Sequence, residues 1–430
     1  MKHAIIFLLV VLGISACHSD QKILIDANYL QNEMKTNSVS KYEKSVQEDL
    51  VFWKRRADAD SEGTTNFKKY ASSLVARFRL YGDISDLKQA ESIISRINNE
   101  THNSESGNLR TLGHVVSLQH RFSETDTMLT KALKNGDNKY ESMLMKFDVA
   151  FELGRISEAN RLLTFIKKPH EYAYYFRLAK MQHYDGDMDK AIESMQEAAD
   201  LSFGNVYLKQ AALSNLADLQ MHIGAFEAAA NNYKTSYEID HSDLHSLKGM
   251  ALVAAFHDKN YALAETVLKY IADKTCSPDV YFNLSQLYQL TGNKKLEKEY
   301  ATQFAEIASQ PVYGNMYNKY LIQLYDGVLN NPKAMLEVAN NEIKNRNTPQ
   351  TNSWYAWALY QNNQAALAMQ VYKKHVSEQP LEGLELYYMG KLMKAENKSI
   401  NANAFFKAAY KNRFELAPNY KSDLEKLVNS

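Results

Sequence analysis

Cysteine is scarce in this sequence, and that excludes a fold held together by disulfides. Only Cys17 and Cys276 occur among 430 residues, too few for a disulfide framework. Proline and glycine are also few, at 7 and 16 residues, which argues against the many short strands and tight turns of a β-sandwich or barrel. Lysine plus arginine equal aspartate plus glutamate at 50 each, so no excess of basic charge indicates nucleic-acid binding.

The residues that are abundant favour helices. Hydrophobic residues make up 45% of the chain and charged residues 23%, a composition typical of a folded protein and not of a disordered chain or a membrane bundle. Alanine, leucine, lysine and glutamate are plentiful and are good helix formers. A chain of this length would form two or three domains of about 150 residues each, unless it is a repeat array that extends one core.

The first 16 residues have the pattern of a secretion signal. One cation, Lys2, precedes an unbroken apolar stretch from Ala4 to Leu12. This stretch is too short to cross a hydrocarbon core of about 30 Å, which takes roughly 20 helical residues. The next residues, Ile-Ser-Ala-Cys at 14–17, resemble the lipobox of bacterial lipoproteins, in which the signal is cut before a cysteine that is then acylated. An ordinary cleaved signal is the alternative.

The lipobox resemblance implies an address in the bacterial cell envelope. It implies a signal peptide at 1–16 and a palmitate-type lipid anchor on Cys17, which would be the only contact with the membrane. His18 and not aspartate follows the cysteine, so the inner-membrane retention rule of some Gram-negative bacteria is not met and the outer membrane is expected. The periplasmic or surface face stays open. Residues 17–40 are polar and are interpreted as a tether.

A repeating pattern occupies the rest of the chain. From Tyr175 to Ala198, apolar and small residues fall at helical spacing on both sides of Gly186, which predicts a helix, a tight turn and a second helix. The same pattern returns around Gly224 and Gly292. The glycines at 154, 186, 224 and 292 are separated by 32, 38 and 68 residues. A period near 34 residues indicates a solenoid of stacked helix pairs.

These residues resemble the tetratricopeptide repeat (TPR). The resemblance implies an all-α, right-handed α-solenoid of about ten TPR-like helix-turn-helix repeats over 41–430, with capping helices at both ends. Phe52 and Trp53 of the first capping helix are expected to turn inward. Paired helices approach closely where one side chain is small, and the corresponding positions are Val75, Gly113, Phe147, Ala179, Ala217, Ala251, Ser285, Gln323, Ala356 and Gly390. All seven prolines fall between helices or at helix starts, as helix geometry requires.

No motif in the sequence indicates catalysis or a cofactor. The acidic stretch 185–189 resembles the start of a calcium loop, but Lys190 and Gln196 occupy the positions that need glycine and glutamate. His241 and His245 have a spacing that allows two zinc ligands on one helix face, yet an exposed pair is the favoured interpretation because no HExxH motif is present. Cys276 has no identifiable base, and no P-loop, dinucleotide fingerprint or nucleophile elbow occurs. The sequence therefore predicts no enzyme, no cofactor and no metal.

The repeat resemblance also implies a binding groove. In tetratricopeptide proteins the first helices of the repeats line a concave groove that holds an extended peptide or a partner helix. Carried over position by position, the groove-facing candidates are Phe176, Lys180, His183, Asp218, His222, Lys248, Phe282 and Gln286. Their mixed character favours a peptide or protein over a polyanion. The lysine–asparagine pair with which chaperone-binding members clamp a terminal carboxylate is missing at these positions.

Together these patterns favour a non-catalytic, lipid-anchored TPR protein that mediates protein–protein interaction or scaffolding in the bacterial cell envelope. Its partner would be another envelope protein or peptide in the concave groove, and nucleic acid is not expected. The alternative is a glycan- or nutrient-binding envelope lipoprotein, like the starch-utilisation type that also contains these repeats. That type builds its sugar site from large loops rich in tryptophan, glycine and asparagine, whereas this chain has three tryptophans and no such insertion.

Overall fold

The computed structural model describes residues 22–36, 39–60, 62–396 and 399–429, and across these ranges all regular structure is helical, without a strand. The predicted signal peptide and Cys17 lie outside the described residues. None of the described helices has both the length and the apolar composition needed to cross a membrane.

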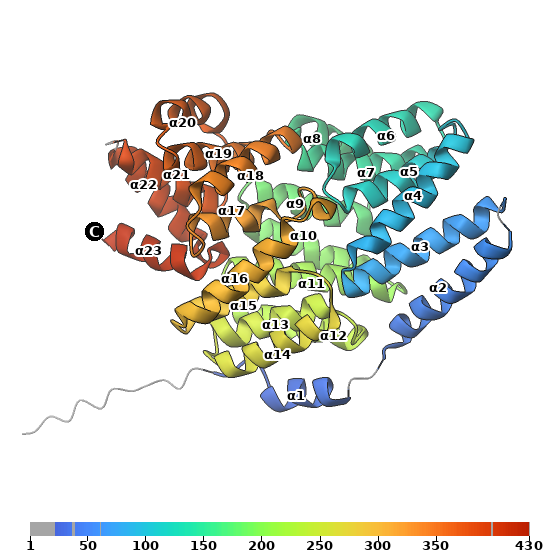
Figure 1. The fold of residues 1–430 in the computed structure, drawn as a ribbon, viewed down its shortest axis with the longest axis horizontal. Coiled ribbons are helices and arrows are strands. Elements are labelled where there is room, and N and C mark those ends of the chain that lie inside the picture. Colours follow the sequence, from blue (N-terminus) through green and yellow to red (C-terminus); the bar gives the residue numbers. More distant parts are fainter. Residues whose placement is uncertain (1–21, 37–38, 61, 397–398, 430) are drawn as a thin grey trace, which may run out of the picture.

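Ten helix pairs follow one another along the chain (Figure 1). This confirms the predicted all-α solenoid and its number of repeats. The pairs are α3 (Thr64–Tyr81) with α4 (Ile84–Glu100), α5 (Ser106–Ser117) with α6 (Phe122–Asn135), α7 (Lys139–Glu152) with α8 (Ile156–Phe165), α9 (Tyr172–Tyr184) with α10 (Met188–Leu201), α11 (Val206–His222) with α12 (Phe226–Ile239), α13 (Leu244–Phe256) with α14 (Tyr261–Lys274), α15 (Asp279–Leu290) with α16 (Lys294–Ala308), α17 (Asn318–Asp326) with α18 (Pro332–Asn345), α19 (Pro349–Gln361) with α20 (Ala365–Val371), and α21 (Gly383–Ala395) with α22 (Ser399–Lys411).

Three further helices flank this array. They are α1 (Ala27–Thr36), α2 (Lys41–Ala59) and α23 (Pro418–Asn429). Helix α2 turns Trp53 toward the first core cluster, as expected. Phe52 was also expected inside, but 41% of its surface is exposed. Successive side chains point about 100° apart around a helix, and Phe52 is turned toward the surface, where it packs edge-on against Trp53 with ring centroids 4.9 Å apart.

The described part of the predicted tether is packed against the solenoid. The backbone N–H groups of Leu24 and Ile25 donate to the Asp258 carboxylate at 3.0 and 2.9 Å. Helix α1 then buries Leu30 completely, in the cluster that extends from α11 to α15. The interpretation of residues 17–40 as a tether is therefore wrong for residues 22–36, which pack on the solenoid. The mostly polar composition of this segment masked its two buried apolar residues, Ile25 and Leu30.

Glycine and small residues act where the periodicity placed them. Gly154, Gly186, Gly224 and Gly292 all have φ between 69° and 78°, the left-handed conformation that ends a helix without a Cβ clash. At the helix crossings, Ala179, Ala217, Ala251, Ser285 and Ala356 are buried. The prolines lie at helix starts, in a 3₁₀ turn or between helices, which confirms the repeat frame.

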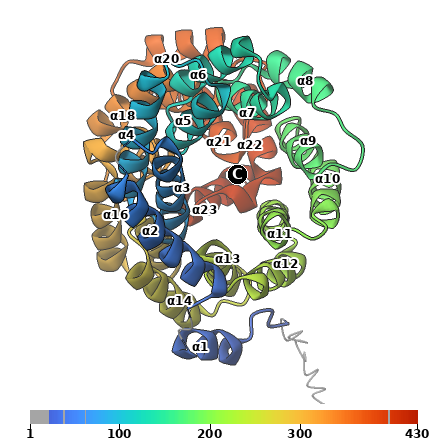
Figure 2. The same cartoon turned by 90° about the vertical axis from the view of Figure 1, so that its right-hand side faces the viewer.

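The array winds through more than one turn of a superhelix, seen end-on in Figure 2. Helix ends and loops one superhelical turn apart touch. The Thr275 hydroxyl donates to the Tyr81 carbonyl at 2.9 Å, and Arg346 Nη1 donates to Glu152 Oε2 at 3.1 Å. Each of these contacts joins residues 194 positions apart, so nearly six repeats complete one turn at the period of about 34 residues.

Turn glycines form the seam between successive turns of the superhelix. A Cβ built on Gly82 would lie 2.7 Å from Ser277 Cβ, and one on Gly154 would lie 3.0 Å from Thr348 Cγ2. A Cβ on Gly224 would lie 2.5 Å from the Phe414 ring. These glycines therefore serve twice, since they end a helix and also let the next turn approach.

The end of the chain, residues 413–429, lies inside the superhelix (Figure 2); we call it the C-terminal segment. It consists of the 3₁₀ turn η3 (Arg413–Glu415) and α23. The Asn419 N–H donates to Gln289 Oε1 at 2.8 Å, and the Tyr420 hydroxyl contacts Asp326 Oδ2 at 3.0 Å. Phe414 packs edge-on against Phe226 at 5.5 Å. The segment therefore covers the last helix pair and also fills part of the interior.

Candidate functional site in the superhelix interior

The interior of the superhelix is lined by oppositely charged pairs that water can reach. Lys248 Nζ lies 3.5 Å from Asp279 Oδ2, and their side chains are 22% and 35% exposed. Lys319 Nζ lies 3.8 Å from Glu382 Oε2, with 45% and 43% of the side chains exposed. These residues belong to α13, α15, α17 and the start of α21. The interior is thus polar and hydrated, and offers both charges to a ligand.

One cavity of about 230 Å³, the Lys248 pocket, lies where the α3–α4 turn meets α13 and α15. Burial alone would raise the pKa of Asp279, but the Lys248 ammonium and the Ser277 hydroxyl lower it below its usual value. Burial alone would lower the pKa of Lys248, and Asp279 raises it. The pocket therefore holds a preformed ion pair. It is lined by Phe78, Arg79, Leu80, Gly82, Leu244, His245, Lys248, Ile271, Thr275, Ser277, Asp279 and Val280.

Asp218, on the inner face of α11, organises a neighbouring network. It accepts a hydrogen bond from the Tyr233 hydroxyl at 2.6 Å and lies 3.0 Å from His245 Nε2. Burial opposes the charged form of Asp218, but these partners lower its pKa, and Asp218 raises the pKa of His245. The ring of His241 instead contacts Glu33, with 2.8 Å from Nδ1 to Oε2. The two histidines are therefore engaged by different carboxylates and do not share a site.

A second cavity of about 230 Å³, the Trp354 pocket, lies between the α7–α8 turn and α19. Glu385, which is fully buried, is one of the residues that line this pocket. Oε1 of Glu385 accepts from Trp354 Nε1 at 2.6 Å, whereas Oε2 has no partner. Burial raises the pKa of Glu385. The pocket is lined by Phe151, Glu152, Gly154, Ile156, Tyr184, Lys319, Arg346, Thr348, Pro349, Gln350, Thr351, Trp354, Glu382 and Glu385.

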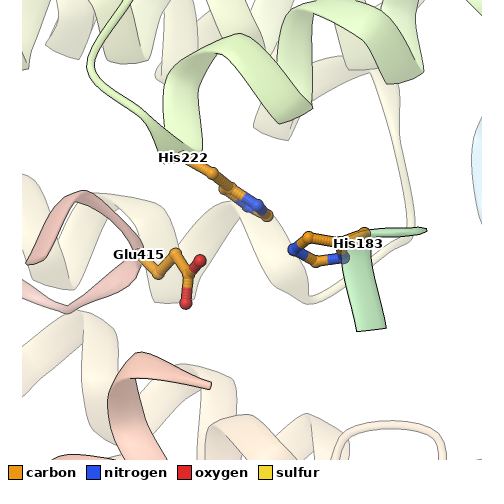
Figure 3. Close-up of side chains that lie close together, drawn as sticks. All are labelled: His183, His222 and Glu415. Atoms are coloured by element: carbon orange, nitrogen blue, oxygen red, sulfur yellow. The ribbon is translucent and has the colours of Figure 1, made fainter. Parts of the chain in front are cut away.

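A third group joins residues from three parts of the chain (Figure 3). His183 and His222 come from the last turns of α9 and α11, and Glu415 from η3. One ligand atom of each lies within 4.8 Å of the others. Burial lowers the pKa of His222 to about 4 and raises that of Glu415 to about 7. Both groups therefore favour their neutral forms more than they would in water.

The structure places the eight groove candidates on α9, α11, α13 and α15, each of which is the first helix of its pair. It brings His183 and His222 together, with ring centroids 5.5 Å apart, and puts Lys248 and Asp218 in the networks above. Lys180 Nζ lies 3.8 Å from Asp148.

Three other candidates have local partners. Phe176 stacks on Tyr172 at 5.5 Å. Phe282 is only 5% exposed and packs in the core. Gln286 borders a small cavity closed by Asn419 and Tyr420 of the C-terminal segment.

Sequence reasoning missed Glu415, Arg346, Trp354 and Glu385. Their positions in the interior depend on how the superhelix winds and on where the C-terminal segment lies. The local periodicity of the sequence does not encode either of these. Fully buried Glu385 carries a sequence signal, because it is an acidic residue at an apolar helical position. No local signal marks Glu415.

Cys276 lies in the seam between superhelical turns. Its N–H donates to the Tyr81 carbonyl at 2.6 Å, and the side chain is exposed. Partial burial and then the nearby Asp83 and Asp86 raise the pKa of its thiol. A nucleophilic cysteine needs the opposite shift, so the surroundings of Cys276 do not activate it.

Acid is expected to destabilise the fold through His114 and His120. Burial lowers the pKa of both to about 4, while the unfolded chain keeps a value near 6.5. The unfolded state therefore binds more protons between these values, and stability is lost as the pH falls from about 6.5 to 4. We expect His120→Asn to flatten this fall in urea denaturation from pH 7 to 5, because asparagine tolerates the left-handed φ of 57°.

His102→Asn is the matched control for this pH effect. His102 also has a left-handed φ, 50°, but its side chain is exposed. An equal flattening in both variants would contradict the assignment to half-buried His120.

The repeats themselves match a known family. Residues 172–205 and 278–311 match the family model described as tetratricopeptide repeat. Two segments of the chain are thus tetratricopeptide-like. The matched segments span the tetratricopeptide pairs α9–α10 and α15–α16, and helix pairs of the same form continue on both sides of each. This confirms, for these two pairs, the resemblance drawn from the sequence.

Several solved structures are similar to this chain at low sequence identity. A tetratricopeptide repeat protein from Parabacteroides merdae is 17% identical, with 60% of this chain and 99% of that chain covered and a TM-score of 0.34. Pseudomonas aeruginosa pilF is 12% identical, covers 50% and 97%, and has a TM-score of 0.37. A human IFIT1 dimer is 14% identical, covers 90% and 95%, and has a TM-score of 0.46. No curated protein matches the sequence.

Proposed function

We propose that this tetratricopeptide protein is a lipid-anchored, non-catalytic scaffold of the bacterial cell envelope that holds a segment of another envelope protein in the superhelix interior. The observation that carries the proposal is the hydrated, charge-paired lining with two cavities of about 230 Å³ each. Both cavities lie at the seam between superhelical turns, where two sets of helices contribute side chains.

The chemistry of the lining favours a peptide. The Lys248 pocket offers Lys248 and Asp279, and the Trp354 pocket offers Arg346 and Lys319 beside Glu152. An extended peptide carries donors, acceptors and charges of both signs, and replaces water against such a surface. A nucleic acid would place its phosphates near these carboxylates, which is unfavourable.

The lipid anchor would join the solenoid on the side formed by α12–α14. Lys22 pairs with Glu227 at the start of α12, and Leu24 and Ile25 are held by Asp258. Cys17 precedes Lys22 by five residues, which span at most about 18 Å when extended. An acylated Cys17 would therefore hold the surface of α12–α14 close to the bilayer.

The partner is tested by site-specific crosslinking in living cells. A photoreactive amino acid at Gln350, which borders the Trp354 pocket, is expected to capture one envelope protein in stoichiometric amount. The control position is Lys295, exposed on the second helix α16. Equal capture from both positions, or none from Gln350, would reject interior binding. Micromolar binding of an oligosaccharide in calorimetry would favour the glycan-binding alternative.

The anchor is tested separately with Cys17→Ser. We expect the variant to lose incorporation of a labelled fatty acid and to leave the membrane fraction, because the acyl chains supply the membrane affinity. Cys276→Ser is the matched control and should stay acylated. Membrane retention and labelling of Cys17→Ser would overturn the lipid anchor without touching the partner proposal.

A further inference from the structure

Two imidazoles and one carboxylate converge inside the superhelix from three elements far apart in sequence. They belong to His183, His222 and Glu415, and their nearest ligand atoms lie within 4.8 Å of one another (Figure 3). Imidazole nitrogen and carboxylate oxygen are the ligands with which proteins hold Zn²⁺ and related first-row ions. Calcium and magnesium prefer sites made only of oxygen.

The surroundings of this group leave both space and an unused donor atom. A cavity of about 80 Å³ is bordered by His222, Glu415, Lys319 and Glu382. Nδ1 of His222 is buried and has no hydrogen-bond partner. A buried polar atom without a partner costs about 1–3 kcal/mol, and coordination of an ion would satisfy it.

We propose that His183, His222 and Glu415 bind one divalent first-row transition metal ion of the Zn²⁺ type. In a tetrahedral Zn²⁺ site with bonds of about 2.0–2.1 Å, the ligand atoms lie about 3.4 Å apart, so the three side chains close inward on binding. Three protein ligands leave the fourth position to water or to a group of a bound partner.

The local charge favours a cation. Glu382 borders the same cavity as His222 and Glu415, and its carboxylate interacts electrostatically with both His183 and His222, while Lys319 is its counter-charge. Coordination would also attach the C-terminal segment to α9 and α11. The bound ion would thus hold the C-terminal segment in its position inside the superhelix. This effect requires neither a lipid anchor nor a bound partner.

Calorimetry with the purified full chain tests the site. After removal of metals with a chelator, one equivalent of Zn²⁺ should bind at pH 7.5. His183→Gln, His222→Gln and Glu415→Gln should each weaken binding at least tenfold, because each removes one ligand. His241→Gln is the matched control. It removes a histidine of the His241–His245 pair, which lies outside the proposed site, and this variant should bind Zn²⁺ as the wild type does. Absence of Zn²⁺ binding, or loss with His241→Gln and not with His222→Gln, overturns the proposal.

A second measurement needs only the wild-type chain, so it does not depend on the folding of a variant. Zn²⁺ should slow amide hydrogen exchange in η3 and at the ends of α9 and α11, because the ion joins these elements. Exchange in α1, which packs on α14 and carries none of the three ligands, should not change. Protection elsewhere without protection of η3 would place the ion at another site and reject this one.

Discussion

Replacing Gly82 with alanine is expected to lower the free energy of unfolding by about 2–5 kcal/mol. Gly82 has a φ of 68°, and a side chain in the left-handed region costs about 1–2 kcal/mol. Its Cβ would also lie 2.9 Å from the Ser277 backbone nitrogen. Backbone cannot rotate away as a side chain does, so this crowding adds about 1–3 kcal/mol. The shift is measured as the urea midpoint at unchanged slope.

Gly186→Ala separates the two contributions. Gly186 has nearly the same backbone conformation, with a φ of 78°, but nothing lies within 4 Å of its Cβ position. This variant should lose only the conformational part, about 1–2 kcal/mol. Equal losses in both variants would mean that the contact between superhelical turns contributes nothing to stability in solution.

Replacing Phe304 with alanine is expected to cost about 3–5 kcal/mol, because it opens a cavity in a core that relaxes only in part. Phe304, on the second helix α16, is fully buried. Its ring meets Phe282 at 5.7 Å and Tyr317 edge-on at 5.8 Å. Removing it weakens the junction between α15–α16 and α17, and urea denaturation followed by circular dichroism measures the loss.

Phe203→Ala is the matched control for the same chemical change. Phe203 is 98% exposed in the α10–α11 connection, so its truncation should change the free energy of unfolding by no more than about 0.5 kcal/mol. A comparable loss would show that Phe203 is covered in solution. A small loss for Phe304→Ala would show that the stack tolerates a hole at this junction.

The sequence predicted the helix pairs because their causes are local. Glycines such as Gly186 and Gly292 end first helices through a left-handed turn, and small residues such as Ala217 and Ala251 allow the crossing. Both causes act within about 34 residues, which is the range that a repeat pattern records. Pro278 and Pro349 mark helix starts for the same reason.

The path of the superhelix was not predictable, because it accumulates small rotations over many repeats. Arg346 and Glu152 meet only because 194 residues make one turn. The same geometry brings Glu415 to His183 and His222, so no local motif could reveal that group. Helix α1 was not predicted for another reason: its composition is polar like that of a linker, and Leu30 is its one fully buried residue.

The seam between superhelical turns changes how the molecule responds to force. An open solenoid lengthens like a spring, because each repeat contacts only its neighbours. Here the Thr275–Tyr81 and Arg346–Glu152 hydrogen bonds connect successive turns of the superhelix. Stretching the molecule along the superhelix axis must therefore break these bonds first. Under tension we therefore expect a stiff cylinder that yields abruptly, and not a soft elastic coil.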